Sequence, residues 1–177
     1  ADTVGEGVPI EVLTENAHLL PATGKALDLA CGLGGNALFM ARRGLQVTAW
    51  DLSPVAIDHL QRAAADLPIH AEVRDVTALP PLPGCFDVIC VGHFLDRALC
   101  PSIAAALRPG GLLYYHAFTR ERVDDSGPGS ERSRLASNEL LDLFPELIVR
   151  VYRDEGRSGD ITCGWRNRAQ LVAQRPA

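Results

Sequence analysis

Three features are missing from this sequence of 177 residues. No apolar run approaches the roughly 20 residues that a membrane-spanning helix needs, and the amino end shows no charged-then-apolar signal peptide. Basic residues are not in excess either, because 17 Lys and Arg against 22 Asp and Glu give a formal net charge of −5. A nucleic-acid-binding surface is basic. We therefore expect neither a membrane nor a nucleic acid as partner.

A pattern of paired cysteines is also missing. The chain has five cysteines, an odd number, without Cys-x-x-Cys spacing, which fits neither a disulfide framework nor a zinc site. Reduced thiols are typical of the cytoplasm, so we expect a cytoplasmic protein without a metal site. The cysteines are Cys31, Cys85, Cys90, Cys100 and Cys163.

The length suits one globular domain, 1–177, with a core of its own. No internal repeat and no second domain are visible, and the sequence is silent on oligomeric state. We divide the chain into an N-terminal segment (1–25), a core (26–118), a polar loop (119–136) and a C-terminal helix with two strands (137–177).

The stretch 26–51 reads as strand, glycine turn, helix and second strand. The first strand is apolar except for Asp28. Gly32 and Gly34 allow a sharp turn and remove side chains that would block a ligand. Asp51 closes the second strand 19 residues after Gly32, close to the spacing that places a carboxylate on a ribose diol. The stretch therefore predicts a site for a nucleotide-like ligand.

The rest of the chain alternates between helical and strand patterns. Five strands separated by crossovers require a parallel sheet, and the last two strands have no helix between them, which requires an antiparallel pairing. We predict an α/β fold with a doubly wound, mostly parallel seven-stranded sheet and an antiparallel strand near the C-terminus. The expected helices are 10–20, 36–43, 54–66, 95–107 and 137–144, and the expected strands are 26–30, 45–50, 69–73, 86–91, 112–118, 147–152 and 168–173, with a turn at 108–111.

A dinucleotide site is the first alternative, because Gly32-x-Gly34-x-x-Ala37 satisfies the loose dinucleotide pattern. Two observations count against an NAD-type oxidoreductase. The carboxylate of Asp28 would repel a pyrophosphate and favour a ligand with a cationic end. The chain also has no spare length for a substrate domain.

The motifs of the core resemble those of the class I S-adenosylmethionine-dependent methyltransferases. Residues 28–34 resemble the acid-x-Gly-x-Gly-x-Gly motif of that family, with Ala30 in place of the first glycine. Asp51 matches the acid that binds the ribose hydroxyls, and 75–76 matches the carboxylate and apolar pair near the adenine. Residues 86–89 and 107–112 match the motifs at the fourth and fifth strands.

This resemblance implies the Rossmann-like methyltransferase fold, S-adenosylmethionine as cofactor and methyl transfer as the activity. The segments 15–18, 36–38 and 49–51 are similar to those of the small tellurite-resistance-type methyltransferases. The residues that the resemblance assigns to the cofactor are Asp28, Ala30, Cys31, Gly32, Gly34, Asn36, Asp51, Leu52, Asp75, Val76, Val91 and Gly92.

The methyl acceptor is less well defined. The segment 91–94 differs from the Asn/Asp-Pro-Pro-aromatic motif of enzymes that methylate exocyclic amines, so we expect a small-molecule acceptor methylated by a positioned in-line displacement. A hydroxyl acceptor needs a general base, and only His93 and His116 stand at strand ends, although each also suits a structural role. The candidate acceptor-binding residues are Phe94, Arg97, Phe118 and Arg120. A cofactor-binding protein without catalysis stays open as a third alternative.

Overall fold

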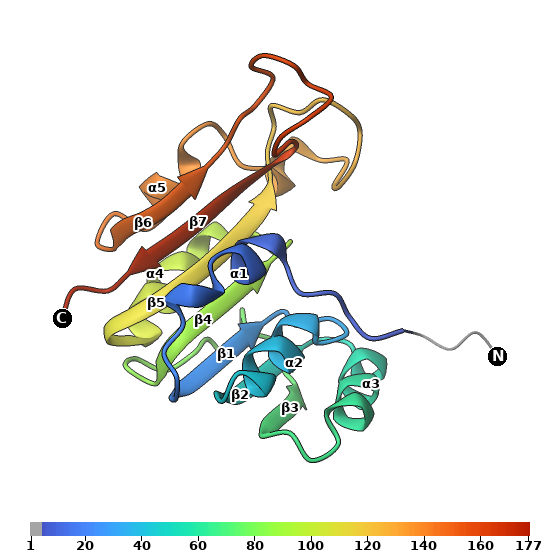
Figure 1. Ribbon diagram of the computed structural model, residues 1–177, viewed down its shortest axis with the longest axis vertical. Helices are drawn as coiled ribbons and strands as arrows, with labels where there is room; N and C mark the ends of the chain where they lie inside the picture. The colour runs from blue at the N-terminus through green and yellow to red at the C-terminus, as the bar shows by residue number, and fades with distance from the viewer. Residues whose placement is uncertain (1–4) are drawn as a thin grey trace.

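The computed structural model describes residues 5–177 and shows one sheet of seven strands in the order β3-β2-β1-β4-β5-β7-β6 (Figure 1). The strands are β1 (Lys25–Leu29), β2 (Gln46–Asp51), β3 (Ile69–Val73), β4 (Phe86–Gly92), β5 (Leu107–Phe118), β6 (Ile148–Arg153) and β7 (Arg168–Gln174). The α-helices are α1 (Glu11–Glu15), α2 (Gly35–Arg42), α3 (Pro54–Ala64), α4 (Cys100–Ala106) and α5 (Glu139–Leu143), and the short 3-10 helices are η1 (Ala17–Leu19), η2 (Arg97–Leu99) and η3 (Glu131–Ser133).

The predicted fold class is confirmed. Strands β1 to β5 pair in parallel, whereas β7 is antiparallel to both β5 and β6. The strand order reverses between β1 and β4, which makes the carboxyl ends of these two strands the expected ligand edge. Because β7 runs the other way, its first residue also lies at this edge.

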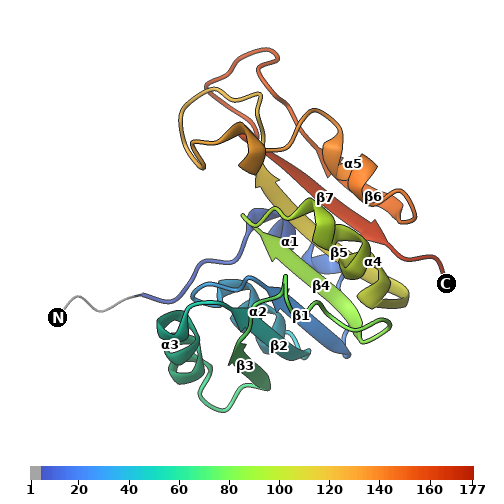
Figure 2. The same ribbon diagram turned by 180° about the vertical axis from the view of Figure 1, so that it is seen from behind.

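Helices cover both faces of the sheet. Helices α1, α2 and α3 lie on one face (Figure 1), and α4 and α5 lie on the other (Figure 2). Because side chains alternate along each strand, they form two separate cores, one on each face of the sheet. Leu27, Ile89 and Leu113 pack toward the α4 face, and their neighbours Ala26 and Val88 pack toward the α2 face.

Local signals set the helix ends as expected. The hydroxyl of Ser53 accepts a hydrogen bond from the backbone N–H of Ala56, and Pro54 occupies the first helical position of α3. Gly44, two residues after the end of α2, has φ +102°, a conformation that favours glycine.

Two local predictions are wrong in detail. The helix expected over 10–20 is split, because the side-chain amide of Asn16 donates to the carbonyl of Val12 and the chain continues as η1. The turn expected at 108–111 lies inside β5. There Gly110 adopts φ +78°, and the pairing with β4 shifts register between Phe86 and Val88.

The segment before α1 lies against the glycine turn. A Cβ built on Gly7 would come within 2.8 Å of the backbone nitrogen of Gly35, so the two backbones are in close contact. The backbone N–H of Ile10 donates to the side-chain oxygen of Asn36 at 2.8 Å. Within residues 5–177, no helix has the length and apolar character to cross a bilayer.

Candidate functional site

The glycine turn joins β1 to α2 at the ligand edge. Ala30, Gly32 and Gly34 all have positive φ, at +55°, +53° and +82°. A Cβ at Gly34 would lie 2.3 Å from Cδ1 of Leu60, so α3 packs directly on this backbone. A Cβ at Gly32 would meet no heavy atom within 4 Å, which leaves its backbone open to a ligand.

Asp51 ties the turn to the end of β2. Its Oδ2 accepts the backbone N–H of Gly32 at 2.8 Å, and its Oδ1 accepts that of Ser53 at 2.9 Å. Each carboxylate oxygen keeps a lone-pair direction free. Asp51 therefore presents a fixed acceptor beside the open backbone of Gly32, the arrangement that the 19-residue spacing predicts.

Asp28 lies beneath the turn and only 1% of it is exposed. Its Oδ2 accepts the backbone N–H of Ala37 at 3.0 Å, and its Oδ1 has no hydrogen-bond partner among residues 5–177. Burial, with a smaller contribution from the charge of Asp51, raises the pKa of Asp28 to about 8. The carboxyl therefore lies beneath the glycine turn, and its unpaired oxygen could accept a hydrogen bond or interact with a cation.

A cavity of about 180 Å³ opens between the carboxyl ends of β1 to β4. Asp51 stands at this cavity, while the side chain of Asp75 accepts hydrogen bonds from Thr77 and fixes the start of the β3–β4 loop. An apolar slot with a carboxylate beside it suits a nucleoside. The residues that line the cavity are Ala30, Trp50, Asp51, Leu52, Arg74, Asp75, Val76, Thr77 and Phe94.

The remaining predicted cofactor residues surround the turn. Cys31 is buried, and burial together with Asp28 and Asp51 raises the pKa of its thiol. Val91 is buried in β4, and Gly92 ends that strand with Ile10 close to its backbone.

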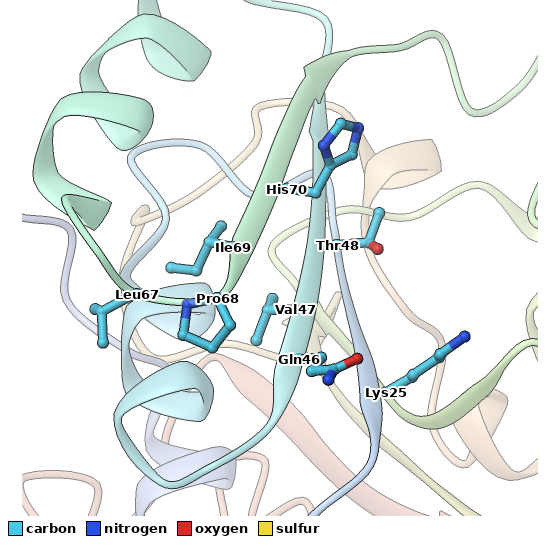
Figure 3. A pocket seen from close by; sticks show the side chains of 8 residues that line it. All are labelled: Lys25, Gln46, Val47, Thr48, Leu67, Pro68, Ile69 and His70. Carbon is cyan, nitrogen blue, oxygen red and sulfur yellow. The ribbon is translucent and has the colours of Figure 1, made fainter.

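A second cavity, of about 450 Å³, lies at the opposite edge of the sheet (Figure 3). Lys25, Gln46 and Ile69, which begin β1, β2 and β3, line it, together with Pro68 and His70. Although it is larger, this cavity lies at the amino ends of the parallel strands, away from the glycine turn. We therefore place the candidate site at the smaller one.

The two predicted catalytic histidines form a pair at the ends of β4 and β5. The Nε2 atoms of His93 and His116 are 2.9 Å apart. His116 is fully buried, and its pKa is lowered to about 3, first by burial and then by His93 and Arg168. His93 has φ +57°, and its ring packs at 5.0 Å from that of Phe118. Both imidazoles are therefore neutral at pH 7.

Phe94 and Phe118 lie on either side of His93 in this part of the fold. Phe94 lines the cavity, and the hydroxyl of Tyr115 donates to its carbonyl. Phe118 is half-buried at the end of β5. Phe118 thus contacts the histidine pair and Phe94 the cavity, and their predicted contact with an acceptor stays a prediction.

The two predicted arginines are engaged elsewhere. Arg97 pairs with Glu139 at 2.6 Å and donates to the carbonyls of Arg132 and Arg134. The Nε of Arg120 donates to the carbonyl of Glu131. Both guanidinium groups hold the polar loop 119–136 in place.

Sequence reasoning missed two residues of this region and the structural role of a third. Arg134 is fully buried and donates to the carbonyls of Pro128, Thr119 and Ser126, so the polar loop is ordered from inside. Trp165 and Arg168 lie near the histidine pair. The antiparallel pairing predicted for the last strands is the signal that would have placed Arg168 at this edge.

Known proteins resemble this chain in sequence and in fold. A methyltransferase-domain family profile matches residues 26–111. The ubiquinone biosynthesis O-methyltransferase of Xanthomonas axonopodis pv. citri (strain 306) is 32% identical, over 94% of this chain and 78% of that protein. That of Xanthomonas campestris pv. campestris (strain B100) is 33% identical, over 85% and 71%.

Two solved structures share the fold at lower identity. A SAM-dependent methyltransferase from Methanosarcina mazei superposes with a TM-score of 0.72 at 19% identity, over 96% of this chain and 99% of that one. TehB from Haemophilus influenzae superposes with a TM-score of 0.74 at 22% identity, over 92% and 61%. The likeness to TehB concerns the fold.

Proposed function

The chain belongs to the class I S-adenosylmethionine-dependent methyltransferases, and on this premise we propose that it methylates a hydroxyl oxygen of a small molecule. The observation that carries the proposal is the pair of neutral imidazoles, His93 and His116, of which His93 directly precedes Phe94, a residue that lines the cavity. Among its relatives are proteins named as O-methyltransferases of ubiquinone biosynthesis, and that name supports an oxygen acceptor.

The residues around the cavity fit the cofactor, which supplies an electrophilic methyl group when bound. Asp51 offers its free lone pairs to the ribose hydroxyls. Leu52 and Val76 offer apolar contact to the adenine, and the open backbone of Gly32 admits the amino-acid end. Asp28 lies beneath that end; its carboxyl is protonated in the free protein, and a bound ammonium group would favour its ionised form.

His93 is the proposed general base. When its Nε2–H donates to Nε2 of His116, its Nδ1 is left with a free lone pair. Because His116 is buried and neutral, it holds the ring of His93 and accepts a hydrogen bond from it in both protonation states. Burial and the charge of Arg168 lower the pKa of His93, which keeps it unprotonated at neutral pH.

The transfer then balances in one step. His93 would accept the proton of the acceptor hydroxyl at Nδ1. The bound cofactor would supply the methyl group to the hydroxyl oxygen and would leave with the electron pair of its sulfur–methyl bond. The chain's task is to align the hydroxyl with that bond and to exclude water.

Calorimetric titration tests the cofactor and the site together. We expect S-adenosylhomocysteine to bind with a Kd below tens of micromolar and NAD not to bind. Asp51→Ala should weaken binding by about 1–3 kcal/mol, because a charge-assisted hydrogen bond to the ribose is lost. Asp58→Ala, which removes an exposed carboxylate on α3, is the matched control and should bind as the wild type does.

Binding of NAD in place of S-adenosylhomocysteine would favour the oxidoreductase alternative. Unchanged affinity in the Asp51 variant would mean that the cofactor binds elsewhere. Cofactor binding without methyl transfer to any member of a panel of hydroxylated small molecules would favour the non-catalytic alternative.

A further inference from the structure

Arg168 stands at the acceptor side of the candidate site because β7 is antiparallel. Its partner in the register of β5 and β7 is Phe118, the last residue of β5. Figure 1 shows β7 starting beside the arrowhead of β5. The first residue of β7 is thereby brought to the edge where the parallel strands end, next to His93.

Two aromatic rings flank the guanidinium of Arg168. Its central carbon lies 4.7 Å from the centroid of the Trp165 ring and 5.9 Å from that of Phe118. Contacts of this kind attract the cation and restrict its motion. The side chain is 27% exposed, so the group is largely enclosed but accessible.

The hydrogen-bond donors of this guanidinium are unused. Within the part of the chain that the structure describes, no hydrogen bond from the Arg168 side chain is formed, and its nearest carboxylate is that of Glu11, at 3.6 Å. Arg97 and Arg134 differ in this respect, since each donates to backbone carbonyls. A guanidinium presents five N–H donors in a planar fork that matches a carboxylate.

We propose that Arg168 binds a carboxylate of the methyl acceptor, so that the substrate is a small hydroxy acid; this rests on the proposed function. The carboxylate takes two parallel hydrogen bonds from the guanidinium and displaces the longer contact to Glu11. Phe118, between Arg168 and His93, packs against the body of the acceptor. The hydroxyl group then faces His93.

Glu11 has an opposing role in this arrangement. Its carboxylate is half-exposed on α1 and competes with the acceptor for Arg168. A neutral side chain at this position removes the competitor and keeps its size. Glu11→Gln therefore separates a binding role of Arg168 from a merely structural one, because a structural ion pair would be weakened by the same change.

The experiment uses the protein saturated with S-adenosylhomocysteine and measures the binding of benzoate and benzamide by NMR titration. These two probes share their shape and differ in charge. We expect benzoate to bind at least tenfold more tightly than benzamide. Arg168→Gln should abolish the difference, and Glu11→Gln should increase the affinity for benzoate severalfold. The matched control is Arg150→Gln, which removes an exposed arginine of β6 and should leave the difference intact.

Equal affinity for the two probes, or no binding of either, would overturn the proposal. So would loss of the difference in the Arg150 variant but not in the Arg168 variant. The preceding titration with S-adenosylhomocysteine distinguishes a failure of the proposed function from a failure of the proposed carboxylate site. If the cofactor product does not bind, the proposed function fails, whereas binding without discrimination refutes only the carboxylate site.

Discussion

Replacing Asp28 by Asn should stabilise the protein at neutral and alkaline pH. Between pH 3.8 and about 8 the folded protein keeps a proton on Asp28, whereas the unfolded chain has lost it. The free energy of unfolding therefore falls by about 1.4 kcal/mol per pH unit across this window. The rise of the pKa from 3.8 to about 8 corresponds to a loss of at most ~6 kcal/mol in the free energy of unfolding, caused by the buried carboxyl.

An asparagine does not titrate, and its side-chain oxygen still accepts the N–H of Ala37. Chemical denaturation of Asp28→Asn and the wild type, without cofactor, at each pH from 4 to 9 gives the difference directly. This difference should be smallest near pH 4, grow until about pH 8 and then stay constant. Two curves that run parallel from pH 5 to 8 would refute the reasoning.

His116 provides an internal check on the same data. Its pKa is lowered to about 3 in the folded protein, so the unfolded chain binds the extra proton below its ordinary pKa of 6.5. Stability should thus be lost as the pH falls from 6.5 toward 3, in the opposite direction to the effect of Asp28. Because both variants contain His116, this loss appears in both and cancels in their difference.

Two further predictions concern the turn and the base. Gly34→Ala should cost about 2–4 kcal/mol of stability, since the new methyl group meets Leu60 and φ is positive; denaturation measures this, and the same change should cost less in a Leu60→Ala background. His93→Gln should lower kcat by about 10²–10⁴-fold without changing the affinity for S-adenosylhomocysteine. In the wild type, kcat/KM should rise with pH and level off above a pKa below 6.5, and a flat profile would exclude His93 as the base.

The cofactor half of the site follows from local patterns. Gly32, Gly34 and Asp51 lie within one strand-turn-helix-strand unit, and parallel neighbours bring the end of β2 to the glycine turn. The position of Asp28 was predictable in the same way, but its depth was not. The helix that follows the turn donates Ala37 N–H to it, and this draws the carboxyl beneath the backbone.

The acceptor half depends on segments that are far apart in the sequence. The polar loop 119–136 has the composition of a mobile segment, but it is held by a guanidinium, that of Arg134, whose partners are backbone carbonyls. Composition does not reveal such partners, because every residue offers the same carbonyl. Only the folded chain shows that this loop is built around a buried cation.

The hydrogen-bond partners of each arginine are also the reason why we propose Arg168, and not the predicted Arg97, for the acceptor. Arg97 and Arg168 are equal in charge, and both lie at the ligand edge. The donors of Arg97 are consumed by Glu139 and two carbonyls, so an acceptor could bind it only by breaking these bonds. Those of Arg168 form no hydrogen bond among residues 5–177, so an anion that binds there gains hydrogen bonds and displaces only the longer contact to Glu11. The expected charge of the substrate therefore depends on which hydrogen-bond donors the fold leaves free. The number of arginines in the sequence does not reveal this.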